Sequence, residues 1–157
     1  MVVTVLMVGK TSEAFVAEGI EHFIKRLKHY LPVKIITLPD IRERKNLSPN
    51  MIRDKEAETI NAAIPKPSTL VLLDEKGVEF RSLDFAGFMQ KQMNSGSKEL
   101  VFIIGGAYGV SESLQKKADF VLSLSRMTFT HQFIRLMLAE QLYRAMTILK
   151  NEPYHNE

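Results

Sequence analysis

A run of glycines follows a strongly apolar segment and is the first candidate for binding chemistry. Gly105, Gly106 and Gly109 come directly after the apolar residues 100–104. Because glycine has no side chain, such a run lets the backbone approach a ligand closely and adopt positive φ angles. It has neither the Gly-Lys-Ser/Thr ending of a Walker loop nor the G-x-G-x-x-G spacing of a dinucleotide fingerprint, which argues against those two modes of phosphate binding. A tight structural turn is the alternative interpretation.

A second candidate is the polar stretch that connects the last apolar run to the final helical segment. It reads Leu122-Ser123-Leu124-Ser125-Arg126-Met127-Thr128-Phe129-Thr130-His131. Its hydroxyls and backbone amides could hold an adenosine or a carboxylate. Alternatively, Thr130 only caps the helix that follows, and the pattern alone favours capping.

The final helical segment has a wider apolar surface than one contact with a sheet requires. This surface comprises Phe133, Ile134, Met137, Leu138, Gln141, Leu142, Ala145 and Ile148. Its width predicts a second partner, and Arg135, Glu140 and Arg144 would then be charges at the rim of an interface between two protomers. Glu140 and Arg144 are four residues apart, so a simple ion pair within the helix is the alternative.

Two further polar clusters carry weaker signals. The terminal Tyr154-His155 segment follows a proline outside any predicted helix, where chain ends usually fray. A basic cluster closes the first helical segment, and it is either a solvated helix end or a contact for phosphate; its members are Lys25, Arg26, Lys28 and His29. His22 lies mid-helix, and no grouping of His, Asp and Glu has metal-ligand spacing.

Composition narrows the class of protein. The 157 residues are 25% charged and 45% hydrophobic, which predicts one compact domain over residues 1–157. A net charge of +3 permits a polyanionic partner without requiring one. The absence of cysteine excludes disulfides, thiolate metal sites and a thiol nucleophile, so a cytoplasmic protein is expected. The apolar run Val2–Val8 is too short to span a bilayer and lacks the flanks of a signal peptide, so neither export nor membrane insertion is expected.

Apolar runs and helical periodicities alternate along the chain. The predicted strands are Val2–Val8, Val33–Leu38, Thr69–Leu73, Leu100–Ile104 and Phe120–Leu124, and the predicted helices are Glu13–Tyr30, Met51–Ala63, Leu83–Asn94, Glu112–Lys117 and His131–Lys150. Asp74–Gly77 is predicted to be a polar turn, and Asp40–Leu47 a mobile loop. The alternation indicates an α/β fold with a mostly parallel sheet and ligand-binding loops at the carboxyl ends of its strands.

Taken together, several segments resemble one family over essentially the whole chain. They are Val8-Gly9-Lys10, Leu72-Leu73-Asp74, the glycine run with Ala107-Tyr108, residues 122–129, His131-Gln132-x-x-Arg135, Glu140-Gln141-Leu142-Tyr143-Arg144-Ala145 and Pro153-Tyr154-His155. The family is the bacterial ribosomal RNA large-subunit methyltransferase H family, whose members are minimal SPOUT (α/β-knot) enzymes. The resemblance implies a C-terminal trefoil knot, whereas the general rule against threaded chains alone would favour an open flavodoxin-like sheet.

The resemblance also implies an activity. Such enzymes transfer the methyl group of S-adenosyl-L-methionine to N3 of pseudouridine 1915 in helix 69 of 23S rRNA, acting as homodimers on the assembled 70S ribosome, with no metal and no membrane. The resemblance places the cofactor against Leu73, Gly105, Leu124, Ser125, Arg126, Met127, Thr128 and Phe129. These residues belong to the two loops described above and to the end of the third strand.

Proton removal from N3 is the chemical task that falls to the protein. His155 is our hypothesis for the base, because a histidine titrates near neutral pH. Tyr154 would stack on or bond to the uracil ring. Arg144 would stabilise charge on the ring or hold a phosphate, and Glu140 would orient Arg144.

Two rival functions remain open. A related SPOUT enzyme acting on tRNA or on a ribose would share the knot and the cofactor loops, but such enzymes usually carry additional RNA-binding domains. A regulatory module could bind a nucleotide or RNA without catalysis. The small net charge also predicts weak binding to free rRNA.

Overall fold

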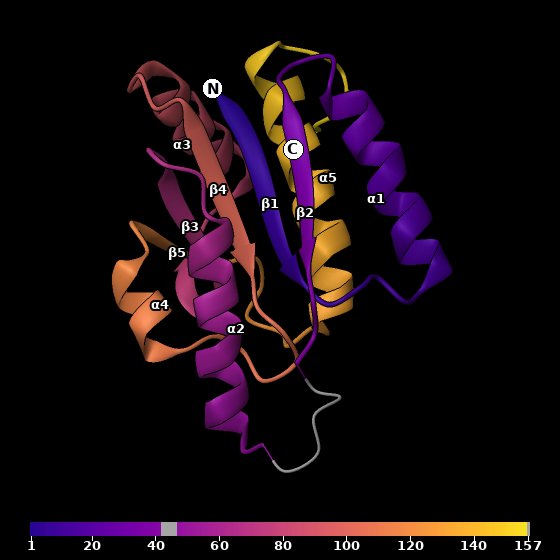
Figure 1. Ribbon diagram of the computed structural model, residues 1–157. Coiled ribbons are helices and arrows are strands. Elements are labelled where there is room, and N and C mark those ends of the chain that lie inside the picture. The colour runs from indigo at the N-terminus through magenta and orange to yellow at the C-terminus, as the bar shows by residue number, and fades with distance from the viewer. Residues whose placement is uncertain (42–46, 157) are drawn as a thin grey trace.

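Strands and helices alternate along the chain (Figure 1). A computed structural model describes residues 1–41 and 47–156. The strands are β1 (Val2–Val8), β2 (Val33–Leu38), β3 (Thr69–Glu79), β4 (Glu99–Ile104) and β5 (Phe120–Ser123). The helices are α1 (Ala14–Leu27), α2 (Pro49–Ala63), α3 (Ser82–Asn94), α4 (Glu112–Lys117) and α5 (His131–Leu149). The predicted α/β class is confirmed, and apart from β3 each predicted element is present within about three residues of its expected bounds.

The sheet has the strand order β2-β1-β4-β3-β5. Every neighbouring pair is parallel, so the predicted parallel character holds throughout the sheet. β4 lies between β1 and β3, which differs from the flavodoxin-like order in which the third strand neighbours the first. The trefoil knot implied by the family resemblance stays a prediction.

The prediction of a polar turn at Asp74–Gly77 is wrong, because β3 continues to Glu79. Its pairing with β5 shifts register between Leu73 and Val78, so the polar residues form an irregularity inside the strand. Gly77 permits this pairing, because a Cβ atom there would lie 2.6–2.7 Å from the backbone of residues 122–123. The close approach of the β3 and β5 backbones, which the sequence does not reveal, allows β3 to continue through its polar residues.

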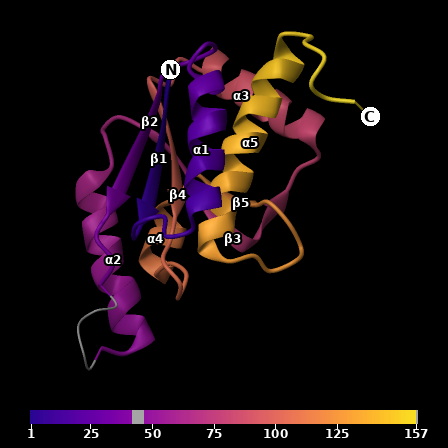
Figure 2. The ribbon, with the colours of Figure 1, turned by 90° about the vertical axis from the view of Figure 1, so that its right-hand side faces the viewer.

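Helices cover both faces of the sheet. Figures 1 and 2 show α1, α3 and α5 on one side and α2 and α4 on the other. Val5 and Met7 of β1 face the first group of helices, whereas Leu6 and Val8 belong to the core beneath the second group. Successive side chains of a strand point to opposite faces, which explains why β1 is apolar without alternation.

Three strand positions meet in register near the carboxyl edge of the sheet. Leu73 of β3 pairs with Ile104 of β4 on one side and with Leu122 of β5 on the other. The loops that leave this edge therefore start side by side. The predicted mobile loop Asp40–Leu47 falls mainly on residues 42–46, outside the described residues. None of the helices in the described part of the chain is long and apolar enough to cross a membrane.

Candidate functional site

A cavity of about 610 Å³ opens at the carboxyl edge of β3, β4 and β5. It is lined by seven of the eight residues predicted to contact a cofactor, namely Leu73, Gly105, Leu124, Ser125, Met127, Thr128 and Phe129. Arg126 is the exception, because its Nε atom lies 2.8 Å from a carboxylate oxygen of Glu79 and its side chain is 90% exposed. The strand register therefore gathers both predicted loops around one hollow.

The glycine run forms a tight turn and a wall of this cavity at the same time. Gly106 and Gly109 pair as an antiparallel bridge, and the Gly109 amide donates to the Gly106 carbonyl at 3.1 Å. Gly109 has φ +77, which favours glycine. At Gly105 a Cβ atom would lie 2.6 Å from Cγ1 of Val110. The two interpretations of this run are thus compatible, since the turn is what shapes the wall.

The second loop caps α5 and also lines the cavity. The Thr130 hydroxyl accepts a hydrogen bond from the Phe133 amide at 3.2 Å, which confirms the helix cap and stabilises α5 by about 1 kcal/mol. Five residues before the cap, in the loop itself, the Ser125 hydroxyl accepts from the Met127 amide at 2.9 Å. These local bonds hold the loop in a bent shape, and residues 122–125 and 127–131 line the cavity along its inner side.

Apolar side chains surround the cavity and remain accessible. Met127 is 74% exposed, Tyr108 46% and Phe129 37%. Phe129 stacks on Phe133, with ring centres 5.7 Å apart. Flat apolar surfaces beside backbone polar groups suit a ligand with an aromatic ring.

Sequence reasoning missed the contribution of α2 to the cavity. Arg53 of α2 lines it, together with the charged residues Asp74, Glu75 and Lys76 of β3. Nothing in the local pattern of α2 marks Arg53, because only the packing of α2 against the sheet brings it to the glycine run. In the described part of the chain no group of three or more His, Asp or Glu side chains could hold a metal ion.

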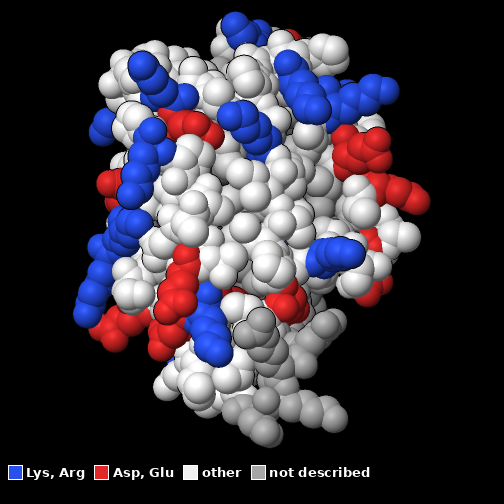
Figure 3. Space-filling view, viewed as in Figure 1, with Lys and Arg blue, Asp and Glu red and all other residues white. Residues whose placement is uncertain are grey.

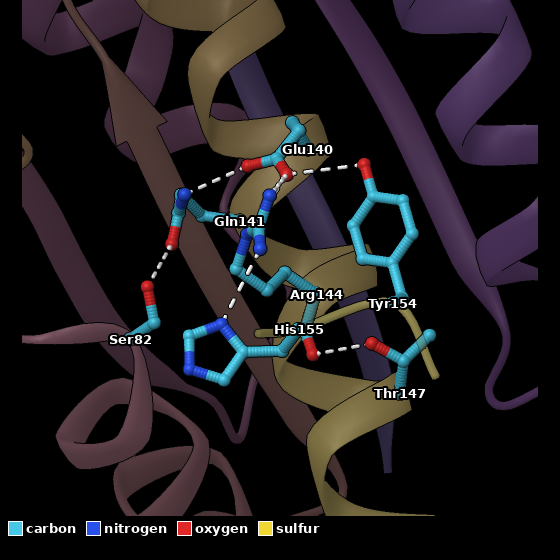
Figure 4. A network of polar contacts seen from close by, with 7 residues as sticks. All are labelled: Ser82, Glu140, Gln141, Arg144, Thr147, Tyr154 and His155. Carbon is cyan, nitrogen blue, oxygen red and sulfur yellow. Dashed lines mark hydrogen bonds and ion pairs between the residues drawn. The ribbon is translucent and has the colours of Figure 1, made fainter. Parts of the chain in front are cut away.

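The four predicted catalytic residues form one network on α5 and the tail (Figure 4). The Arg144 guanidinium donates twice to Glu140 Oε1, from Nε at 2.9 Å and from Nη2 at 2.6 Å, which confirms the ion pair within the helix. Tyr154 donates to the same oxygen at 3.2 Å, and Arg144 Nη1 lies 3.3 Å from Nδ1 of His155. An arginine can only donate, so Nδ1 is the acceptor in this contact.

The expectation of a frayed tail is wrong, because a helix-capping turn folds the chain back. Asn151 has φ +54, the Glu152 amide donates to the Thr147 carbonyl at 2.9 Å, and the Asn151 amide donates to the Ile148 carbonyl at 3.0 Å. These are the two bonds of a Schellman motif, with asparagine in the left-handed position. The reversal brings Tyr154 back to Glu140, 14 positions earlier. An asparagine directly after the last helical turn is the signal that could have predicted it.

Burial and a neighbouring charge favour the protonated form of Tyr154. Burial, then the negative charge of Glu140 and the hydrogen bond to it, raise the pKa of Tyr154 above its ordinary value. Its phenol is therefore a neutral donor at physiological pH. The Arg144 guanidinium carbon also lies 4.8 Å from the centre of the Tyr154 ring, a cation–π distance.

Within one chain the network and the cavity are separate. The cavity reaches α5 only at its first turn, through His131 and Ile134, and none of the four network residues lines it. Ile134 and Arg144 are separated by roughly 15 Å along the helix axis. The structure therefore brings the predicted site residues together as two groups rather than one.

Arg135 does not lie at the rim of an interface, as the sequence had suggested. It is 2% exposed and points into its own chain. Its Nη2 donates to the carbonyl of Val8 at 2.5 Å and its Nη1 to the hydroxyl of Thr11 at 3.0 Å. It thereby ties α5 to the end of β1. Phe133, Ile134 and Met137 on the same helix stay half-buried.

Comparisons with known proteins agree with this architecture. The family model described as "Predicted SPOUT methyltransferase" matches residues 1–155. Proteins named ribosomal RNA large subunit methyltransferase H are similar over the full length: one from Parabacteroides distasonis is 48% identical over 157 residues, covering 100% of both chains, and one from Geobacter metallireducens is 45% identical over 156 residues, covering 99% of each. A solved structure, a probable methyltransferase from Bordetella pertussis, aligns with a TM-score of 0.54 at 8% identity, covering 92% of this chain and 93% of that chain, a likeness of fold alone.

Proposed function

Because this chain belongs to the SPOUT methyltransferase family, we propose that it transfers a methyl group from S-adenosylmethionine to N3 of a pseudouridine in helix 69 of large-subunit ribosomal RNA. The observation that carries this proposal is the single cavity lined by seven of the eight residues that the family resemblance assigned to the cofactor. The names of the full-length relatives support ribosomal RNA as the substrate class.

The cavity suits this cofactor in size and chemistry. About 610 Å³ lies within the usual range of roughly 300–1,000 Å³ for small-molecule sites. Leu73 and Leu124 offer apolar contacts, and the loop around Ser125 offers hydroxyls and amides. Gly105 and the rest of its turn let the backbone come close to a ligand. When bound, S-adenosylmethionine supplies a methyl carbon activated by its sulfonium, so the protein has mainly to align the acceptor nitrogen with it.

We propose that the network on α5 handles the proton. His155 takes the N3 proton, and it does so at Nδ1 only after Arg144 has released that atom. Arg144 then binds negative charge on the uracil ring or a phosphate while Glu140 keeps hold of its guanidinium. Tyr154, neutral at physiological pH, stacks on or donates to the ring. Binding of RNA to Arg144 would thus expose the base.

We further propose that the active species is a homodimer. The separation of network and cavity within one chain favours a site in which the tail of one protomer meets the cavity of the other. The half-buried apolar side chains of α5, among them Ile134 and Met137, together with the exposed Met127, offer the surface for such an interface.

Methyl transfer from labelled S-adenosylmethionine tests the proposal. The substrates are intact ribosomes lacking the modification, free 23S rRNA and tRNA, with the product nucleoside identified by mass spectrometry. We expect label on pseudouridine N3, from ribosomes only. Label on tRNA or on a ribose would overturn the substrate while keeping the enzyme class, and cofactor binding without transfer would favour a regulatory module.

A further inference from the structure

The proposed role of His155 requires a defined position for the tail, and α1 contributes contacts that could provide it. Tyr30, just after α1, donates its hydroxyl to a carboxylate oxygen of Glu152, the third residue after the end of α5. Arg26 lies four residues before Tyr30, in the last turn of α1. Its guanidinium carbon is 4.7 Å from the ring centre of Tyr143 and 6.0 Å from that of Tyr154.

Tyr143 connects these contacts into one cluster. It is 5% exposed, on the side of α5 that faces α1. Its ring lies 4.8 Å from that of Tyr154 and 6.0 Å from that of Tyr30, each edge to face. Figure 2 shows α1 and α5 side by side, with the tail leaving the far end of α5. The tail thus contacts α5 through Glu140, the last turn of α1 through Arg26, and Tyr30 just after α1.

We propose that Arg26 and Tyr30 are positioning residues, which hold Glu152 and Tyr154 so that His155 is presented to the substrate in one orientation. This inference rests on the proposed function of His155. The Schellman turn fixes the backbone only as far as Glu152. Beyond that residue the chain is held by one backbone bond, from the Tyr154 amide to the Glu152 carbonyl, and by side-chain contacts. His155 follows Tyr154 directly and contacts Arg144 through Nδ1.

The chemistry of these contacts indicates positioning rather than stability of the fold. The Arg26 side chain is exposed, and the bond between Tyr30 and Glu152 is exposed as well. Contacts at the surface contribute little to global stability, whereas a chain terminus without them frays. Their loss should therefore change the rate of proton transfer more than the free energy of unfolding or the affinity for the cofactor.

The first test removes one hydroxyl. Tyr30→Phe keeps the ring beside Tyr143 but deletes the donor to Glu152. We expect the single-turnover rate of methyl transfer to ribosomes, at saturating cofactor, to fall about tenfold, the loss typical of a hydrogen bond to a charged group. The dissociation constant of S-adenosylhomocysteine should stay within about twofold of the wild-type value, since the cavity is untouched.

Variants at Glu152 distinguish a loss of positioning from a general loss of stability. Glu152→Ala should slow methyl transfer as much as Tyr30→Phe does, and the double variant should be no slower than either single variant, because both remove the same bond. Glu152→Gln should recover most of the rate, because its amide oxygen still accepts the hydrogen bond from Tyr30. Glu58→Ala, at an exposed glutamate of α2, is the matched control and should behave as wild type. Unchanged rates in Tyr30→Phe and Glu152→Ala, or a rate loss that only follows a lower melting temperature, would overturn the proposal.

Hydrogen exchange on residues 150–156 tests whether Tyr30 anchors the tail, without any measurement of activity. Tyr30→Phe should speed exchange in this segment, including the Tyr154 amide that donates to the Glu152 carbonyl at 2.9 Å. Equal exchange in wild type and variant would overturn the anchoring. If wild-type protein transfers no methyl group to any RNA, it is the proposed function that fails, and faster exchange in the variant still supports the anchor.

Discussion

The carboxylate of Glu56 occupies the space that a side chain at Gly106 would need. Both of its oxygens lie 2.8 Å from the position of a Cβ atom at Gly106, and Glu56 is only 3% exposed. A carboxylate of α2 is therefore packed beneath the turn that forms one wall of the cavity. A side chain at this position would therefore have to displace a buried carboxylate that comes from a helix about fifty residues earlier in the chain.

Gly106→Ala should consequently weaken both the fold and the cavity. We expect a loss of about 1–3 kcal/mol in the free energy of unfolding, the usual cost of overpacking, measured by urea denaturation. Affinity for S-adenosylhomocysteine, measured by calorimetry, should fall as the turn shifts. Gly87→Ala is the matched control: a Cβ atom there meets nothing within 4 Å on α3, so the substitution should stabilise by up to about 1 kcal/mol. Equal behaviour of the two variants would refute the packing argument.

Arg135→Met should destabilise the fold of the single chain, because Arg135 bonds to residues of its own chain. The buried carbonyl of Val8 loses a donor at 2.5 Å, which costs about 1–3 kcal/mol. Arg81→Met is the control, because Arg81 pairs with Asp84 at the surface and its loss should cost less than about 1 kcal/mol. Both are measured by urea denaturation of dilute protein. A loss that appears only at concentrations where the protein dimerises would instead place Arg135 in an interface.

His155→Ala tests the identity of the base. If His155 takes the N3 proton, the single-turnover rate should fall about a hundredfold or more, the contribution typical of a positioned base. Arg144→Gln is the companion variant, and it should slow the reaction less than His155→Ala does, because the base itself stays in place. A His155→Ala rate that equals wild type at every pH would show that another group accepts the proton.

The bond between Tyr30 and Glu152 predicts a specific dependence on alkaline pH. The hydrogen bond to Glu152, assisted by burial, raises the pKa of Tyr30 from 10.0 to about 12. A raised pKa means that the bond stabilises the native state fully below pH 10 and that this contribution disappears as the pH approaches 12. The difference in stability between wild type and Tyr30→Phe should therefore be constant from pH 7 to 9 and narrow above pH 10. A difference that widens above pH 10 would contradict the assigned direction.

Binding to naked RNA should be weak. On the face seen in Figure 3, basic and acidic side chains are interspersed around an uncharged centre rather than gathered into one basic surface, and the net charge is only +3. We expect a dissociation constant of roughly 1–100 μM for a helix 69 hairpin at physiological salt, weakening further as salt rises. Fluorescence anisotropy measures it. Nanomolar binding that resists salt would show that the hairpin alone is recognised.

Much of the fold was predictable because its signals are local. Continuous apolar runs such as Val2–Val8 indicated strands covered on both faces, and helical periodicity indicated the covering helices. The cap at Thr130 and the pair of Glu140 with Arg144 depend on spacings of three and four residues, so they too could be predicted. The β3 extension could not, because it depends on how closely the β5 backbone approaches Gly77.

The sequence by itself therefore determined the elements, their parallel arrangement and, through the family resemblance, which residues to inspect. Only the tertiary structure decided that Arg126 turns away from the cavity to Glu79, that Arg135 is buried and that Glu152 of the tail meets Tyr30, just after α1. It also separated the cavity from the network on α5. The physical reason is distance along the chain. These contacts join residues 47 to 127 positions apart, so they depend on strand order and helix packing, which no local spacing encodes.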